Sequence, residues 1–484
     1  MRKILLSLFL AHLLCANDII ETSPLQENII NTNNELNYDY ISNMKKGLTR
    51  DFYINEYLKT DISSNEAFNI LSLIDNINNK LFFNFSRKYD HDETKAVAQC
   101  MQMDYKQLIH SYSDCIVNGL TLKKASKLSS LELNTIIQKI EKKYPFFSKK
   151  LKVLASPIPF TKLIVQNEDI FYDIFLGVDE RFRENYFNYK IPKRTLKKIH
   201  NNSKFKEFLK VSLTNPTLNL LQKTFKDFED TSKLDSESLF YFAINSIILK
   251  DYNKAYKYLL DAKKNEKKQF QIDKIDFWLY LITKDNNILK KLSISNNLNF
   301  YSYYANELLG NKLDDSNINI LQIDKINSIK NDYNLKRVAL LYSFAKIESN
   351  FDKNKISKDF NVGIFQLDSN VIKKITLQNN LSYNINNFFT IENNIKYMNK
   401  YLDSLANQNN NDVLKTFISF YNASKELNKI KTYKLEHPLS KYLNFELLNI
   451  DNKQNFVLWY VLYYNKLSEN KKDFTTIKAV LETL

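Results

Sequence analysis

The sequence predicts an all-α protein in which an N-terminal α-solenoid, or superhelix, precedes a compact helical domain. The chain of 484 residues contains only 5 glycines and 7 prolines. Sheets need turns that are rich in these two residues, so their scarcity favours helices joined by short polar loops. The hydrophobic fraction of 44% is large enough for a real core, which excludes global disorder.

Apolar residues recur at three- and four-residue spacing through most of the chain, as in amphipathic helices. One example runs from Leu239 to Ile248 and resumes from Ala255 to Ala262, with a polar break at 251–253. This pattern predicts a helical hairpin whose small alanines lie at the packing face. Similar hairpins follow one another without a strict repeat length, which predicts an irregular solenoid over residues 17–310. A solenoid is a shape and not an activity, so a scaffold that binds protein partners is one alternative.

A polar segment separates the predicted solenoid from a compact last region. Gly310 closes the last solenoid helix, residues 311–327 are polar and are predicted to form a linker, and a compact domain is expected over 328–484.

The first 16 residues resemble a secretory signal. A basic start at Arg2 and Lys3 precedes an apolar run that ends at Leu14, and Ala16 is the expected cleavage site. The run is too short to span a bilayer, and no later segment is long and apolar enough to do so. A periplasmic protein with no transmembrane span in the mature chain is therefore expected. Lipidation of Cys15 is the alternative.

The two remaining cysteines are Cys100 and Cys115. In an exported protein, a pair of cysteines suggests one disulfide. The alternative is two free buried thiols.

The net charge of +15 suits an anionic partner, but the lysines are spread along the chain and form no dense basic block. We expect no nucleic-acid partner. The histidines, including His91, His110, His200 and His437, are scattered without metal-ligand spacing. No metal and no cofactor are predicted.

The residues that suggest chemistry begin on a helix expected over 335–351. Val338, Leu341 and Ala345 form its apolar stripe, and Glu348 is the next position on that stripe. Burial disfavours the charged form of a carboxyl group, so the pKa of Glu348 should be raised and the group could donate a proton to a leaving oxygen. The alternative is a glutamate on the helix edge that pairs with a nearby lysine.

Polar residues after Glu348 strengthen this interpretation. Gly363 stands in a loop, where glycine permits a close backbone approach to a ligand, and Gln366 can both donate and accept hydrogen bonds, as recognition of a sugar amide requires. Tyr421 ends an apolar stripe from which its hydroxyl could orient a buried acid, although most of the 30 tyrosines must serve packing.

Five blocks in this order resemble the soluble lytic murein transglycosylases, whose catalytic domain is similar to goose lysozyme. The matching blocks are Glu348-Ser349, then Ser357 with Gly363-Ile364-Phe365-Gln366, then Glu392-Asn393-Asn394-Ile395 with Tyr401-Leu402, then Phe420-Tyr421-Asn422-Ala423, and finally Glu446 before a tyrosine-rich helix. Ser424 replaces the family's glycine, and the block at Glu446 lacks the family's proline.

The resemblance implies a lysozyme-like fold for the last domain and a reaction at a single acid. Glu348 would cleave the bond between N-acetylmuramic acid and N-acetylglucosamine and leave a 1,6-anhydro end. Tyr421 would orient Glu348. Substrate-binding roles are implied for Ser349, Gly363, Phe365, Gln366, Asn422 and Glu446. The implied partners are peptidoglycan glycan strands, with cell-wall synthesis proteins as further candidates. A hydrolytic lysozyme and a non-catalytic cell-wall scaffold are the alternatives.

Overall fold

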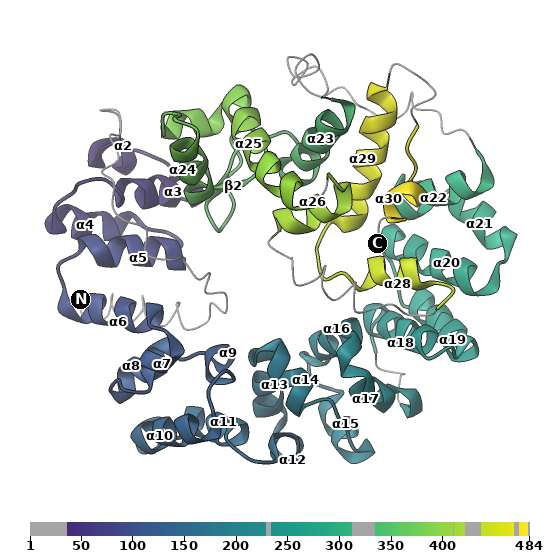
Figure 1. The fold of residues 1–484 in the computed structure, drawn as a ribbon, viewed down its shortest axis with the longest axis horizontal. Helices are drawn as coiled ribbons and strands as arrows, with labels where there is room; N and C mark the ends of the chain where they lie inside the picture. Colours follow the sequence, from purple (N-terminus) through teal and green to yellow (C-terminus); the bar gives the residue numbers. More distant parts are fainter. Residues whose placement is uncertain are drawn as a thin grey trace. The chain divides into compact units, whose positions relative to one another are not determined.

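The computed structural model describes residues 36–228, 234–311, 334–409, 411–421, 437–468 and 474–482. Helices make up nearly all of the regular structure in these residues, and the one sheet among them is a short antiparallel hairpin (Figure 1). The predicted all-α class is confirmed. The predicted signal segment 1–16, with Cys15, lies outside the described residues. No helix among the described residues is long and apolar enough to cross a membrane.

The chain divides into two compact units, and each unit joins two separate stretches of sequence. The first unit combines the residues up to Leu120 with Phe344–Ser404, and the second combines Thr121–Ser343 with Leu405–Leu484. The domain boundaries at 310 and 328 that the sequence suggests stay a prediction.

The first unit packs the N-terminal helices against the central part of the region that contains Glu348. Its elements are α2 (Tyr38–Ser42), α3 (Leu48–Tyr57), α4 (Ser64–Ile70), η1 (Leu71–Leu73), α5 (Asn79–Lys88), α6 (Asp92–Gln102), α7 (Tyr105–Leu108), α8 (Ser113–Gly119), β1 (Asn361–Val362), β2 (Leu367–Asp368), α24 (Ser369–Gln378) and η6 (Ile385–Phe389). Helices α23 (Leu335–Ser349) and α25 (Ile391–Asn409) contribute residues to both units.

The second unit is a succession of helices followed by a C-terminal group. The succession comprises α9 (Leu122–Ala125), α10 (Ser130–Ile140), α11 (Pro145–Leu154), α12 (Pro159–Ile164), α13 (Glu168–Gly177), α14 (Glu180–Tyr186), α15 (Lys193–Ile199), α16 (Phe205–Thr214), η2 (Pro216–Leu218), α17 (Asn219–Gln222), η3 (Lys223–Asp227), α18 (Ser236–Ile248), α19 (Tyr252–Lys264), α20 (Gln269–Thr283), α21 (Asn286–Ser293) and α22 (Phe300–Leu309). The C-terminal group comprises α26 (Val413–Phe420), α28 (Ser440–Leu447), α29 (Lys453–Leu467) and α30 (Ile477–Leu481).

Polar side chains cap the N-termini of many of these helices. The side chains of Ser63, Asn78, Asn167 and Asp235 each accept a hydrogen bond from a backbone N–H of the first turn. Such caps satisfy donors that a helix leaves unpaired and stabilise it by about 1 kcal/mol each. The many Asn, Asp and Ser residues therefore define helix starts in a chain that is poor in glycine and proline.

Helices α18 and α19 form the hairpin that the spacing predicts. Leu239 and Ile247 on α18 are buried against Ala255 and Leu259 on α19, with at most 1% of each residue exposed. Asp251 begins α19 by accepting from the Lys254 N–H. The packing face and the break between the helices both follow the sequence pattern.

The C-terminal group packs on the last helices of the succession in the same unit (Figure 1). The Phe300 ring on α22 stacks on the Phe445 ring on α28 at 5.3 Å. The Ile477 N–H at the start of α30 donates to the Glu307 carboxylate on α22 at 2.8 Å. Segments about 140 to 170 residues apart thus share one core.

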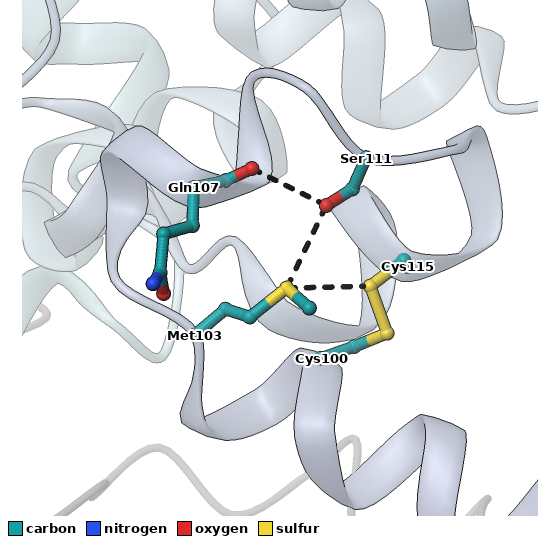
Figure 2. Close-up of a disulfide and its surroundings, with 5 residues drawn as sticks. All are labelled: Cys100, Met103, Gln107, Ser111 and Cys115. Atoms are coloured by element: carbon teal, nitrogen blue, oxygen red, sulfur yellow. Dashed lines mark hydrogen bonds between the residues drawn. A yellow bond between two sulfur atoms is a disulfide. The ribbon is translucent and has the colours of Figure 1, made fainter.

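A disulfide joins Cys100 on α6 to Cys115 on α8 (Figure 2). Met103 Sδ lies 3.9 Å from Cys115 Sγ and also accepts a hydrogen bond from the Ser111 hydroxyl. Gly119 lets α8 approach α6 closely, because a Cβ at this position would lie 2.0 Å from the Cys100 carbonyl oxygen. The disulfide and the glycine therefore stabilise the same helix contact.

His437 joins the C-terminal group to the end of α18. Its Nδ1 accepts from the Leu439 N–H at 3.0 Å, and its Nε2 lies 3.0 Å from the Ile247 carbonyl oxygen and 3.4 Å from the Tyr252 hydroxyl. An Nδ1 that accepts a hydrogen bond carries no proton, so this geometry requires the neutral ring. Burial lowers the pKa of His437 by more than the hydrogen bond to the Ile247 carbonyl raises it, and the positive charge of Lys250 lowers the pKa further.

We predict that His437 makes folding less favourable in mildly acidic solution. The unfolded chain binds a proton here near pH 6.5, whereas the folded chain binds it only at lower pH, so stability falls as the pH drops below about 6.5. One group changes the free energy of unfolding by at most about 1.4 kcal/mol per pH unit. Urea unfolding at pH 7.5 and 5.5 should show a larger loss for the wild type than for His437→Gln. Equal losses would contradict the prediction.

Candidate active site

Glu348 lies in the last turn of α23, and the middle turns of this helix are buried. Leu341, Phe344 and Ala345 are fully buried, whereas the Glu348 side chain is half-buried. Its main-chain carbonyl accepts a hydrogen bond from Lys355 Nζ at 2.5 Å. The apolar stripe thus brings the carboxyl group to the edge of the core, so burial is less complete than the sequence suggests. The raised pKa stays a prediction.

Ser349 connects the end of α23 to the loop that carries Gly363 and Gln366. Its hydroxyl lies 3.2 Å from the Ala345 carbonyl oxygen, one turn back on the same helix, and 2.8 Å from the Ile364 carbonyl oxygen in the loop. The residue is 6% exposed. Because a buried hydrogen bond is costly to break, Ser349 fixes the loop relative to the helix turn that carries Glu348.

Gly363 occupies a position that no other residue fits. Its φ of +75° lies in the left-handed region, and a Cβ would lie 2.0 Å from Asn394 Oδ1 and 2.7 Å from the Phe388 carbonyl oxygen. Asn394 is itself buried, and its Nδ2 donates to the carbonyl oxygens of Phe388 and Thr390. The sequence blocks around Gly363 and Asn394 therefore meet in the first unit.

Gln366 presents one acceptor that the described part of the protein does not use. Its Nε2 donates to the carbonyl oxygens of Lys355 at 2.9 Å and Gly363 at 2.8 Å. Both partners are acceptors, so the amide orientation is fixed. Its Oε1 is buried and has no hydrogen-bond partner among the described residues. A buried acceptor without a partner is unfavourable, and a ligand N–H or hydroxyl would satisfy it.

The position of Phe365 does not match the substrate-binding role that is expected for it. The residue is 0% exposed, so its ring packs inside the first unit and is not presented to solvent. Direct contact between the Phe365 ring and a glycan would require the loop to change conformation.

Tyr421 is the last described residue before a gap in the described part of the chain. Tyr421 follows the last residue of α26, is 36% exposed, and contacts the Phe417 ring edge to face at 5.1 Å. It belongs to the second unit, so an orienting role beside Glu348 stays a prediction. Asn422 lies outside the described residues.

Glu446 has protein partners for both carboxylate oxygens, all of them in the second unit. Oε1 pairs with Lys274 Nζ at 2.5 Å, and Oε2 accepts from Trp278 Nε1 at 3.3 Å and the Tyr301 hydroxyl at 3.5 Å. Burial raises the pKa of Glu446, but the charges of Lys274 and Lys453 outweigh it and lower the net pKa. Glu446 thus connects α28 to the helical succession, and it also lines a cavity of about 180 Å³. Its role in substrate binding stays a prediction.

Lys355 is a contributor that the sequence analysis missed. Its carbonyl oxygen accepts from the Gly363 N–H at 3.0 Å and from Gln366 Nε2, while its ammonium donates to the Glu348 carbonyl. Two of these bonds use the backbone, which every residue type possesses. No residue pattern could therefore have identified this position.

Part of this chain is similar to a known protein family. Residues 325–439 match a family model described as the transglycosylase SLT domain. This match confirms the predicted resemblance to the soluble lytic transglycosylases over these residues. A search of curated proteins found no match to this chain.

Two solved structures are similar at low identity. One is an inactive mutant of the lytic transglycosylase Slt from Pseudomonas aeruginosa, at 10% identity and a TM-score of 0.43, with 92% of this chain and 90% of that chain covered. The other is the 70 kDa soluble lytic transglycosylase from Escherichia coli, at 10% identity and a TM-score of 0.40, with coverages of 89% and 87%.

The glycine at position 363 provides a test of the loop geometry. Gly363→Ala should lower the free energy of unfolding by more than Gly310→Ala does. Both glycines have positive φ, but a Cβ at Gly310 would have no neighbour within 4 Å, so Gly310→Ala measures the backbone strain alone, about 1–2 kcal/mol. The contact with Asn394 should add about 2 kcal/mol or more. Urea unfolding of both variants checks this, and equal losses would contradict the assigned geometry.

Proposed function

We propose that this protein cleaves the β-1,4 bond between N-acetylmuramic acid and N-acetylglucosamine in peptidoglycan without water, leaving 1,6-anhydro ends. The observation that supports the proposal most directly is the connection made by Ser349. It joins the helix end that carries Glu348 to the loop that carries Gln366, within a segment that matches the transglycosylase SLT domain.

Glu348 serves as both acid and base in this proposal. Its carboxyl proton passes to the glycosidic oxygen as the bond to the muramic acid C1 breaks. The resulting carboxylate then takes the proton of the muramic acid C6 hydroxyl, whose oxygen bonds to C1 and closes the anhydro ring. One residue suffices because the attacking oxygen belongs to the substrate, whereas most glycosidases place two carboxylates across the bond.

Two acidic residues near the loop, Asp352 and Asp368, have structural roles. The Asp352 carboxylate accepts from the Asn354 N–H at 2.9 Å. Asp368 accepts from the Asn370 N–H at 2.7 Å and pairs with Lys80. Both carboxylates thus have structural partners, and the proposed reaction needs no second carboxylate of the kind that hydrolysis with inversion or retention usually requires.

Gln366 is proposed to recognise a sugar amide through its unpaired Oε1, which can accept from an acetamido N–H. Gly363 and Ser349 shape the loop that presents this oxygen. Tyr421 is proposed to orient Glu348, and Asn422 and Glu446 to contact substrate further along the glycan. Export through the signal segment 1–16 would bring the protein to peptidoglycan in the periplasm, where cell-wall synthesis proteins are candidate partners.

The mass of the released products tests the reaction type. Sacculi digested with the wild-type protein should yield muropeptides one water lighter than the hydrolytic products, because no water enters the reaction. Mass spectrometry of the soluble fraction measures this difference. If every product carries a hydrated reducing end, the protein is a hydrolytic lysozyme, and if no product is released, the scaffold alternative stands.

Replacement of the acid tests the assignment of Glu348. Glu348→Gln keeps the side-chain shape but removes the proton, and a positioned acid contributes about 10²–10⁴-fold to rate. We expect a loss of at least about 10²-fold in muropeptide release, with an unchanged thermal midpoint. Glu93→Gln, an exposed glutamate of the first unit, is the control and should keep the wild-type rate. A folded Glu348→Gln that retains more than about a tenth of the rate would refute the assignment.

A further inference from the structure

The loop after α23 contains an unusual concentration of left-handed backbone. Five residues between 350 and 366 have positive φ: Asn350 at 54°, Phe351 at 64°, Phe360 at 59°, Gly363 at 75° and Gln366 at 48°. Glycine adopts this region without cost and asparagine with little, whereas each of the other three residues loses about 1–2 kcal/mol. Such a loop persists only where surrounding contacts stabilise it.

Many of these contacts come from helix α5, which lies about 280 residues earlier in the sequence. Lys80 Nζ donates to the Asp359 carbonyl oxygen and pairs with the Asp368 carboxylate. Asn78 Nδ2 donates to the Lys358 carbonyl oxygen at 2.9 Å. The hairpin of β1 and β2, with Gly363 and Gln366 at its turn, lies between Asp359 and Asp368. Lys80 therefore bonds to both ends of the segment that presents Gln366.

The pairing of Lys80 with Asp368 is partly shielded from solvent. The Lys80 and Asp368 side chains are 21% and 22% exposed, so this ion pair is less screened than one on the open surface. Asp368 is also the N-cap residue of α24, where its side chain accepts a hydrogen bond from the Asn370 N–H. A single carboxylate thus connects α5, β2 and α24.

Helix α3 and the residues that directly follow it add apolar and polar support to the same segment. The Phe52 ring contacts the Phe360 ring at 6.1 Å and the Phe389 ring at 6.0 Å. Lys59 Nζ donates to the Ser369 hydroxyl at 3.1 Å. Phe360, one of the residues with positive φ, is 0% exposed, so its conformation depends on this packing.

We propose that Lys80 is a positioning residue for substrate binding: from outside the segment that matches the transglycosylase domain, it fixes the loop that presents the Gln366 amide. This inference rests on the proposed function, because Gln366 must contact substrate for the position of the loop to matter. Lys80 itself touches no reacting group in this account. Its loss weakens substrate binding through the loop and leaves the acid at Glu348 intact.

The test compares Lys80→Met with Lys150→Met. Lys150 on α11 forms a comparably buried ion pair with Asp173 on α13, with side-chain exposures of 14% and 28%, and lies in the second unit. Initial rates of muropeptide release are measured over a range of concentrations of solubilised peptidoglycan strands. We expect Lys80→Met to raise KM by about tenfold with kcat changed less than about threefold, and Lys150→Met to change neither. Lys80→Arg should restore KM to within about threefold of wild type, since a guanidinium can donate to both a carbonyl and a carboxylate.

Amide hydrogen exchange separates this inference from the proposed function. Exchange of the segment 355–368 should accelerate in Lys80→Met and stay at the wild-type rate in Lys150→Met. If Lys80→Met does not fold, Asp368→Asn serves in its place, because asparagine can still begin α24 but removes the charge that Lys80 pairs with.

The outcomes separate the two claims. If wild-type protein releases no muropeptides, the proposed function fails, and the exchange data still test whether Lys80 fixes the loop. If the wild-type protein is active and Lys80→Met and Lys150→Met have the same KM and the same amide exchange rate at 355–368, Lys80 has no positioning role. A KM change without faster exchange at 355–368 also overturns it.

Discussion

The hydrogen bond from Ser349 to the Ile364 carbonyl is the interaction on which the candidate site depends. It lies between the helix turn that carries Glu348 and the loop that carries Gln366. Proton transfer to a leaving oxygen requires the acid and the substrate to be positioned within hydrogen-bond reach of each other. A buried hydroxyl that bonds to both segments supplies that constraint. The other contacts of the site stabilise the rest of the loop, including the segment that presents Gln366.

Those contacts explain why the two stretches of the first unit fold together. The loop has backbone conformations that are unfavourable in isolation. Gly363 packs against Asn394 on one side, and Lys80 and Phe52 contact the loop from the N-terminal helices. The free energy that orders the site therefore comes partly from residues far outside the transglycosylase segment. A catalytic segment expressed without helices α3 and α5 would lack this support.

The sequence predicted the features that arise from local chemistry. Hydrophobic spacing predicted the α18–α19 hairpin, because burial of one helix face imposes its own period. Gly363 was expected in a loop where the backbone approaches a ligand closely, and this role stays a prediction. In the structure the need for glycine comes from its positive φ and from the close neighbours Asn394 and Phe388. The sequence did not predict Lys80 or Lys355. Their partners are mostly backbone carbonyls, and Lys80 lies 279 and 288 residues from the two groups that it contacts. Glu348 is also less buried than its stripe suggested, because it lies in the last turn of its helix.

The most direct test of this account compares two buried serines on the same helix. Ser343 donates to the Ala339 carbonyl oxygen on its own helix, whereas Ser349 donates at 2.8 Å to the Ile364 carbonyl oxygen in the loop. Muropeptide release from sacculi should be close to the wild-type rate for Ser343→Ala. For Ser349→Ala it should be about 5- to 150-fold slower, since a buried carbonyl that loses its donor costs about 1–3 kcal/mol. Equal rates for the two folded variants would show that the bond between Ser349 and Ile364 does not organise the site.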